Sequence, residues 1–371
     1  MLFCVVHGCL EGSKYIMRKK SFRILFAGLC FALLVPLSAF ADVVINEQNF
    51  PDYYFRNFLL AQSYGYDGVI TDEEIAGITN LRLDALAATK YARNITNLEG
   101  IKFFTALTSL DCSPCPLTSL DVSGMTALTT LKCRGSYSSL YNCELTELNV
   151  TGCTSLTILD CSSSNYYGYG NGKLTTLYLS GCTALTGLSC SSNQLTSLAV
   201  SKNTALTFLD CSYNQLTSLN ASGCTALKTL YCDNNQLTSL DVSGCTALTR
   251  LYCYNNKISG VNLDAFISSL SNTEGRIYIY DSTSEIEGNV CTKAQVAAIK
   301  AKWWTPYYYN GREWLRYEGS DAPDGIIATE AANGSEFDTN APAYDLNGRR
   351  VENWQSTSGI YIINDKKVVV K

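Results

Sequence analysis

Residues 204–224 are TALTFLDCSYNQLTSLNASGC, and residues 225–245 are TALKTLYCDNNQLTSLDVSGC. Both units have 21 residues and share their leucine, cysteine and asparagine positions. Units of the same length lie at 105–125 and 183–203, and two units stretched by insertions lie at 126–153 and 154–182. A seventh unit begins at Thr246 and decays after Asn262. A fixed period of this length predicts a solenoid, in which each coil buries its apolar side against its neighbours.

The first half of each unit follows the pattern Leu-x-x-Leu-x-Cys-x-x-Asn-x-Leu, as in residues 185–195. This pattern resembles the leucine-rich-repeat family, with cysteine at the third leucine position. The resemblance implies one parallel strand per coil and an asparagine ladder that satisfies backbone groups inside the turns, formed by Asn193, Asn214, Asn235 and Asn256. The second half of each unit has no 3.6-residue period, which excludes long helices there. We therefore expect a mainly β leucine-rich-repeat solenoid of about seven coils over residues 105–267.

The chain has 17 cysteines, and 14 of them lie after residue 41. Most recur at matching positions of the repeat, so that each stacks on the next at the strand spacing of about 4.8 Å. That distance is at the short end of disulfide geometry, and parallel Cβ vectors suit a disulfide poorly. The pattern favours a reduced, buried ladder, with one or more bridges as the alternative. Cys112 and Cys115 have no second pair placed to complete a zinc site, so no metal is expected.

Residues 17–41, MRKKSFRILFAGLCFALLVPLSAFA, have the three parts of a secretory signal peptide. We expect translation to start at Met17 and cleavage to fall between Ala41 and Asp42. The alternative is a short membrane anchor, but the apolar run is shorter than a span usually requires. No membrane span is expected in the mature chain, which indicates a secreted or cell-surface protein.

Charge and histidine content exclude several classes of function. The formal net charge is −5, and residues 1–41 hold five lysines and arginines against one glutamate. The remainder is therefore strongly acidic, which argues against nucleic acid as a partner. The single histidine, His7, lies in the leader, so the mature chain lacks histidine-dependent catalysis and histidine metal ligation. We expect no cofactor.

Residues 42–104 are predicted to form a small helical N-terminal cap and an irregular first coil. Residues 50–60 are predicted to form an amphipathic helix with Tyr54, Phe55, Phe58 and Leu59 on one side. Thr71 and Glu74 match a capping box, with Ile70 and Ile75 as its hydrophobic staple. The alternative for residues 63–74 is a calcium loop, because the stretch partly resembles an EF-hand. Residues 95–104 resemble an irregular opening leucine-rich coil.

Residues 268–318 are predicted to form a mixed α/β C-terminal cap over the last coil. Residues 276–280 favour a strand, and residues 292–303 favour a helix with Val296, Ile299 and Trp303 on one face. Residues 307–317 alternate around Asn310-Gly311, which is typical of a hairpin turn.

Residues 319–325 form a short polar linker, and residues 326–371 are predicted to be a separate, small, β-sandwich-like module. Two hairpins are expected, turning at 347–348 and 364–365. The module resembles the C-terminal sorting domain of the Bacteroidetes type IX secretion system in its Asn-Gly-Arg, its Gly-Ile-Tyr and its closing lysine-rich strand. The resemblance implies a type IX export machinery as a partner; the alternative is an ordinary small β domain.

The strand positions beside the inward leucines face outward and are free to vary. Aromatic residues gather there and just after the strands of the last three coils, namely Phe208, Tyr213, Tyr231, Tyr252 and Tyr254. The two insertions add Tyr137, Tyr141, Tyr166, Tyr167 and Tyr169 among Ser, Gly and Asn, the composition of antibody-like contact loops. We interpret this set as a candidate ligand-binding surface; the alternative is plain β-propensity. The rings of Tyr231 and Tyr252 should lie about 5 Å apart and form a flat strip, suited to a sugar face or an apolar protein anchor.

These observations favour a non-enzymatic protein that recognises a protein or glycan on its outward strand face, for recognition or adhesion. One alternative is a structural surface-layer protein without a specific ligand. Another is a carboxylate-only glycosidase using Asp111 and Asp160, which fall two coils apart on an open face.

Overall fold

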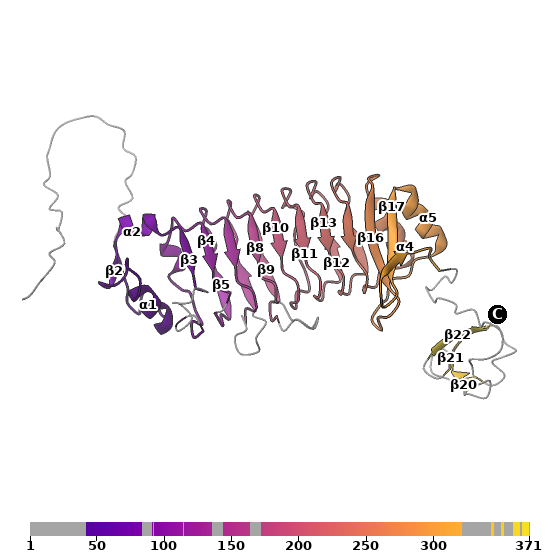
Figure 1. Cartoon of the computed structure of the whole chain (residues 1–371), viewed down its shortest axis with the longest axis horizontal. Helices are drawn as coiled ribbons and strands as arrows, with labels where there is room; N and C mark the ends of the chain where they lie inside the picture. The colour runs from indigo at the N-terminus through magenta and orange to yellow at the C-terminus, as the bar shows by residue number, and fades with distance from the viewer. Residues whose placement is uncertain are drawn as a thin grey trace, which may run out of the picture. The chain divides into compact units, whose positions relative to one another are not determined.

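The structure is a computed structural model. It describes residues 42–83, 91, 93–113, 115–135, 144–163 and 172–320, together with short strands at 343–344, 350–351, 359–363 and 366–370. Over residues 42–320 the described chain is mainly β, and the expected solenoid is confirmed (Figure 1). Residues 1–41, which include the expected signal peptide, lie outside the described part.

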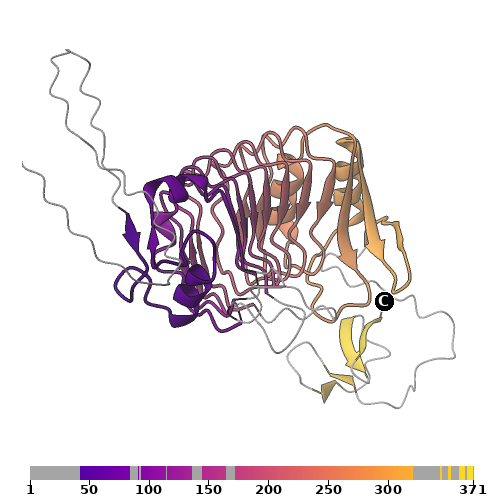
Figure 2. The same ribbon diagram turned by 60° about the vertical axis from the view of Figure 1, so that its left-hand side comes forward.

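The principal sheet of the described chain has eleven strands and receives one strand from each coil. Every pair in it is parallel except the last, and neighbouring coils stay in register, so that Leu188, Leu209 and Leu230 are partners across adjacent strands. Figure 2 shows the strands of successive coils following one another along the solenoid. In chain order the strands are β3 (Asn80–Arg82), β4 (Ser109–Asp111), β6 (Thr130–Lys132), β8 (Ile158–Asp160), β10 (Gly187–Ser189), β11 (Phe208–Asp210), β13 (Thr229–Tyr231), β15 (Arg250–Tyr252), β16 (Gly275–Asp281), β17 (Trp304–Tyr309) and β18 (Trp314–Arg316).

The second leg is extended in the coils before the seventh, where no helix forms, and its strands lie in two separate sheets. One holds β5 (Ser119–Asp121), β7 (Glu147–Asn149) and β9 (Thr176–Tyr178), and the other holds β12 (Ser218–Asn220) and β14 (Ser239–Asp241). The break falls in the coil where Lys202 replaces the glycine of the neighbouring coils, Gly181 (φ 83°) and Gly223 (φ 85°). Lys202 is not among the residues with positive φ, so the left-handed turn of the neighbouring coils is absent where the sheet is interrupted.

Asparagine side chains hold the turns together as a ladder. The Asn235 Nδ2 donates to the carbonyls of Cys211 at 3.0 Å and Cys232 at 3.2 Å, and its Oδ1 accepts from the Leu216 N–H at 3.0 Å. Asn214 and Asn256 repeat these contacts. Each ladder asparagine therefore satisfies backbone groups of its own coil and of the preceding coil, as the resemblance implied.

All thirteen cysteines that the structure describes are buried free thiols. In the strand column, the Cys211 thiol donates to the Tyr231 carbonyl at 3.4 Å; in the second column, the Cys224 thiol donates to the Val200 carbonyl at 3.3 Å. Burial raises the pKa of Cys211 well above its ordinary value and that of Cys182 to about 11. These thiols stay protonated near neutral pH and pack as small apolar groups. Cys143 lies outside the described residues.

The N-terminal cap contains a two-stranded sheet, β1 (Val43–Val44) with β2 (Val69–Ile70), and helix α1 (Tyr53–Leu60). The helix buries Phe55, Phe58 and Leu59. Tyr54, which was predicted on the same side of the helix, is 39% exposed and does not join this buried group.

Helix α2 (Asp72–Gly77) begins with the predicted capping box. The Glu74 Oε2 accepts from the backbone N–H of Thr71 at 3.0 Å and from its hydroxyl at 2.9 Å. Glu74 therefore caps the N-terminus of helix α2. Among the described residues, no group of three or more Asp, Glu, Cys or His is placed to hold a metal ion.

The opening coil follows these elements. It buries Ile95, Leu98 and Phe104 around the 3-10 helix η1 (Ile101–Phe103). Strand β3 pairs in parallel with β4 and is the strand of this opening coil in the principal sheet. The sequence pattern did not predict this strand.

The C-terminal cap extends the principal sheet. Helix α4 (Gly260–Ser269) replaces the second leg of the seventh coil, and β16 then pairs in parallel with β15. Helix α5 (Lys293–Ala301) and the β17–β18 hairpin complete the cap, close to the predicted positions. The expected core role of Trp303 is wrong: α5 ends at Ala301, Trp303 has φ 71° and is 70% exposed, and the next residue, Trp304, is buried instead.

The described part of the C-terminal module is a four-stranded antiparallel sheet in the order β20-β19-β21-β22. Its strands are β19 (Ala343–Tyr344), β20 (Arg350–Val351), β21 (Gly359–Ile363) and β22 (Lys366–Val370). The pairs β19–β20 and β21–β22 match the two expected hairpins, whose turns lie outside the described residues. None of the described helices combines the length and apolarity of a transmembrane span.

Candidate functional site

Two rows of side chains cover the outward face of the principal sheet over its last strands. The inward leucine of each repeat strand separates them. The first row holds Phe208, Thr229, Arg250, Arg276 and Thr305, in register across β11, β13, β15, β16 and β17. The second row, in the same strands, holds Asp210, Tyr231, Tyr252, Tyr278 and Tyr307.

The four tyrosines of the second row form what we call the aromatic ridge: Tyr231, Tyr252, Tyr278 and Tyr307. The ring centroids of Tyr231 and Tyr252 are 4.3 Å apart, which confirms the predicted spacing of about 5 Å. Tyr252 and Tyr278 are 4.2 Å apart, and Tyr278 and Tyr307 are 5.2 Å apart. A continuous stack therefore crosses from the last repeats into the cap.

The rings stand face to face along the sheet and do not lie flat on it. Their planes differ by 13° for Tyr231 and Tyr252 and by 2° for Tyr252 and Tyr278. Each ring thus covers the face of its neighbour. The expected flat strip is wrong. The spacing between neighbouring strands is close to the distance between the centroids of stacked aromatic rings, so the rings stack. Ring edges and hydroxyl groups are left to make outward contacts.

Other aromatic residues flank the ridge. The Phe208 ring lies 5.9 Å from that of Tyr231 and is 38% exposed, so it extends the ridge at one end. Trp314 of the cap hairpin contacts Tyr254 at 5.1 Å and Tyr278 at 5.0 Å between ring centroids. Tyr213, the remaining predicted residue of this group, lies in the turn after β11 and is 40% exposed.

The structure thus brings together Phe208, Tyr231, Tyr252 and Tyr254, and it adds the cap residues Tyr278, Tyr307 and Trp314. The cap was predicted only to cover the last coil, so these three residues were not predicted as part of the candidate site. Their signal is present in the sequence, as tyrosines alternating along residues 276–280 and a tyrosine run at 307–309. The five tyrosines of the insertions, Tyr137, Tyr141, Tyr166, Tyr167 and Tyr169, lie outside the described residues. Gly135 and Ser163, at the start of the two insertions, form a parallel bridge.

Exposed arginines lie beside the ridge. Arg250 and Arg276 occupy paired positions on β15 and β16, and both are exposed. Arg316, opposite Tyr307 in the cap hairpin, is exposed as well. Among the ion pairs of the described residues, none involves these three arginines, whereas Arg134 in an earlier coil pairs with Asp160 at 2.7 Å.

Two carboxyl groups near the last repeats, the buried Asp233 and the partly buried Glu287, have raised pKa values. Burial raises the pKa of Asp233 to about 6, although the Asn234 amide donates to its carboxylate at 2.8 Å. Burial also raises the pKa of Glu287 to about 7. The Glu287 Oε2 accepts from the backbone N–H groups of Asn255 and Asp281, both at 2.8 Å. Glu287 thereby ties the cap to the turn of the last repeat.

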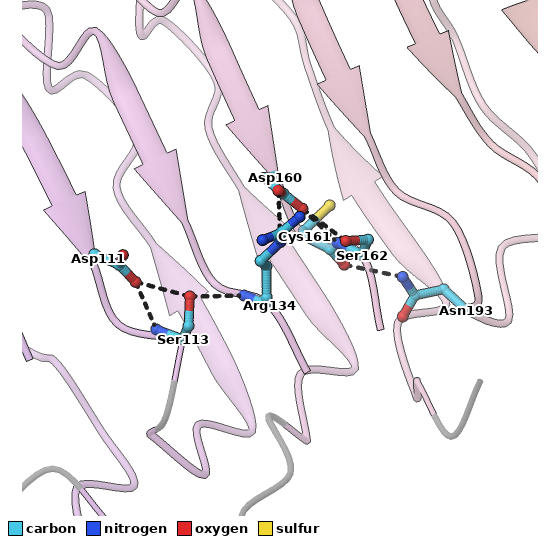
Figure 3. A network of polar contacts seen from close by, with 7 residues as sticks. All are labelled: Asp111, Ser113, Arg134, Asp160, Cys161, Ser162 and Asn193. Carbon is cyan, nitrogen blue, oxygen red and sulfur yellow. Dashed lines mark hydrogen bonds and ion pairs between the residues drawn. The ribbon is translucent and has the colours of Figure 1, made fainter. Parts of the chain in front are cut away.

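A network of polar contacts joins neighbouring coils near the start of the solenoid (Figure 3). The Asp111 carboxylate accepts from the Ser113 hydroxyl at 2.7 Å, and the Asp160 carboxylate pairs with Arg134 and accepts from the Ser162 hydroxyl at 2.7 Å (Figure 3). Lys132 lies between the two aspartates in the sheet register. Both carboxylates are therefore engaged in local structure, which weakens the glycosidase alternative.

A pocket of about 650 Å³ lies at the opposite end of the solenoid, between the N-terminal cap and the second leg of the first repeat coil. Its lining includes Gln48, Asn97, Phe103 and Leu120, and its charged residues Lys102 and Asp121 pair with each other at 2.8 Å. It shares no residue with the aromatic ridge.

Comparison with known proteins adds a family match. The family model described as Leucine Rich repeats (2 copies) matches residues 225–267, which include β13 and β15. No curated protein matches the sequence.

Solved structures with similar coils include bacterial internalins. The functional domain of InlJ from Listeria monocytogenes, which includes a cysteine ladder, is 29% identical, with a TM-score of 0.40. That match covers 71% of this chain and 56% of the other, so this chain spans little more than half of the InlJ domain. An internalin C2 from Listeria monocytogenes is 22% identical over 65% of this chain and 96% of its own, with a TM-score of 0.39.

The family match falls on two coils that share their strand register and their asparagine ladder with the coils just before them. Residues 225–267 therefore match the leucine-rich-repeat model, and the coils from Thr105 to Tyr252 form one continuous solenoid of parallel strands with the same repeat.

Proposed function

We propose that this protein is a non-enzymatic recognition protein that binds a macromolecular ligand through the aromatic ridge. The observation that carries the proposal is the ridge itself: four stacked tyrosines beside exposed arginines on an outward sheet face. Aromatic residues and arginine are the residue types that contribute most to binding energy at protein interfaces. Solenoids present such rows as extended surfaces, because each coil adds one side chain to each row.

The ridge is rigid before any ligand arrives. Its tyrosines stand on strands whose inward neighbours, among them Leu230, Cys232 and Leu251, are fully buried. Stacking between Tyr231, Tyr252 and Tyr278 further restricts their rings. A ligand that binds there orders few additional side chains, which lowers the entropic cost of association.

The proposal includes export and display at the cell surface or outside the cell. The signal-like segment before Asp42 supports the first step. The antiparallel sheet of residues 343–370, with its resemblance to a type IX sorting domain, supports the second. In this scheme residues 42–104 and 268–318 cap the solenoid, residues 319–325 are a linker, and residues 326–371 engage the export machinery.

A binding screen tests the proposal. The purified protein is passed over panels of glycans and of host extracellular proteins, in parallel with the double variant Tyr231→Ala/Tyr252→Ala. We expect at least one ligand that the wild type binds and the double variant loses. Ser109→Ala and Thr130→Ala, on the polar first coils, are the control variants. Absence of any ligand would instead favour a structural surface protein.

A further inference from the structure

The charge and shape around the aromatic ridge narrow the chemistry of its ligand. We propose that the ridge binds an acidic polypeptide segment in extended conformation, with one apolar side chain as its anchor. This inference rests on the proposed function and names its ligand class.

Arg250 and Arg276 place positive charge beside the ridge. They lie directly opposite each other on adjacent strands, and like charges in that arrangement destabilise a sheet. Among the described residues no acidic side chain pairs with either of them. Arg316 adds a third exposed guanidinium next to Tyr307. Guanidinium groups bind carboxylates bidentately, so a carboxylate-bearing ligand would neutralise this repulsion.

Gly187 lies one strand beyond Phe208, the end of the first row. It lies between Ile158 and Phe208 in the sheet register, and these side chains are 46% and 38% exposed. A Cβ built on Gly187 would meet no atom within 4 Å, so the space above its backbone is open. The result is a notch with two apolar walls about 10 Å apart, wide enough for one apolar side chain.

The notch and the arginines fix a spacing for the ligand. Three strand steps separate Gly187 from Arg250 and four separate it from Arg276, which is about 14 to 19 Å at the usual strand spacing. An extended polypeptide rises about 3.3 Å per residue. The anchor residue should therefore lie about four to six positions from the acidic residues.

The orientation of the tyrosine rings favours a polypeptide over a sugar. A sugar that stacks on an aromatic residue needs an open ring face, and the faces within the ridge are covered by neighbouring rings. Ring edges and phenol hydroxyls instead suit the mixed polar and apolar contacts of protein recognition.

A peptide-display experiment tests this inference. A library of random peptides of about 12 residues, long enough to span notch and arginines, is selected on the immobilised full chain. We expect enriched peptides to combine Asp or Glu with an apolar residue about four to six positions away. A synthetic peptide of that kind should bind about tenfold more weakly to Arg250→Ala/Arg276→Ala and to Gly187→Leu, and more weakly at high salt. Lys202→Ala/Lys257→Ala, which removes the same charge from exposed positions outside both rows, should change its affinity less than about twofold.

The outcomes separate this inference from the function on which it rests. Enriched peptides that bind through Tyr231 and Tyr252 but have no excess of acidic residues would overturn the inference and leave the function standing. The inference would also be overturned, and the function would stand, if the library gave no enriched peptide while polygalacturonate or chondroitin sulfate bound in a manner that depends on the two tyrosines. If no probe loses binding in the tyrosine double variant, both proposals fail. Circular dichroism of each variant establishes that a loss of binding is not a loss of fold.

Discussion

Tyr252 of the last repeat and Tyr278 of the C-terminal cap stack with their ring centroids 4.2 Å apart and their planes 2° from parallel. Helix α4 lies between them in the sequence, yet β16 returns to the sheet in register with β15. The cap therefore does more than cover the last coil, because it supplies half of the aromatic ridge. Burial, followed by the hydroxyls of Tyr278 and Tyr231, raises the pKa of Tyr252 above its ordinary value, so the Tyr252 hydroxyl stays protonated at physiological pH.

The cysteine columns should be reduced and inaccessible in the native protein. We expect Cys211→Ser to lower the free energy of unfolding by about 1–3 kcal/mol, because the smaller, more polar hydroxyl replaces a thiol in a fully buried column. Thiol titration before and after denaturation tests whether the cysteines of these columns are reduced and inaccessible in the native protein. Several intact disulfides under non-reducing mass analysis would contradict them.

The asparagine ladder should contribute strongly to stability. Asn235→Ala removes the partners of the Leu216 N–H and of the Cys211 carbonyl inside a buried turn. We expect the free energy of unfolding to fall by about 2–4 kcal/mol in denaturant titrations. The neighbouring Gln236→Ala, at an exposed position, is the matched control and should change it by less than about 0.5 kcal/mol. Equal effects of the two substitutions would rule out the ladder as a stabilising element.

Stability should fall as the pH rises from 5 to 8 because of Asp233 and Glu287. Burial raises their pKa values to about 6 and about 7, so both bind protons more tightly in the folded chain than in the unfolded chain. Their contribution is complete below the unfolded pKa values of about 4 and is lost as the pH passes through the folded values. We expect a loss of about 1–3 kcal/mol, measured by urea unfolding at several pH values. Asp233→Asn/Glu287→Gln should flatten the profile, and a wild-type profile that rises over this range would refute the assignment.

Export should proceed in two steps. N-terminal sequencing of the secreted protein should give Asp42 as its first residue. Deletion from about residue 325 onward should abolish surface display while the protein still leaves the cytoplasm, as fractionation and surface proteolysis would show. Unchanged surface exposure of the truncated protein would eliminate the sorting role of the C-terminal module.

Much of the fold follows from the sequence because the repeat period fixes it. Leucine and cysteine spacing located the outward strands, and Thr71 with Glu74 and Thr292 with Gln295 mark helix starts by local capping contacts. Lys202 shows where local chemistry modifies the repeat, since one side chain in place of glycine accompanies the break in the second sheet.

The features that escaped prediction depend on non-local geometry. Tyr278 and Tyr307 join the ridge only because the cap strands continue the register of the sheet. The cap lies outside the repeat, so the repeat pattern does not predict this register. The burial of Trp304 in place of Trp303 depends on where α5 ends and on one left-handed residue after it. The orientation of the tyrosine rings depends on packing between neighbouring coils and is invisible in a pattern of residue types.

The most direct test of the ridge compares ligand affinity between variants on either side of the repeat–cap boundary. Tyr252→Ala, Tyr278→Ala and the control Tyr178→Ala, an exposed tyrosine of the second leg, are measured against the ligand found in the binding screen, alongside thermal unfolding. We expect the dissociation constant to rise about tenfold for Tyr252→Ala and for Tyr278→Ala, and less than about twofold for Tyr178→Ala, with similar melting temperatures throughout. Wild-type affinity in both ridge variants would show that the ligand binds elsewhere.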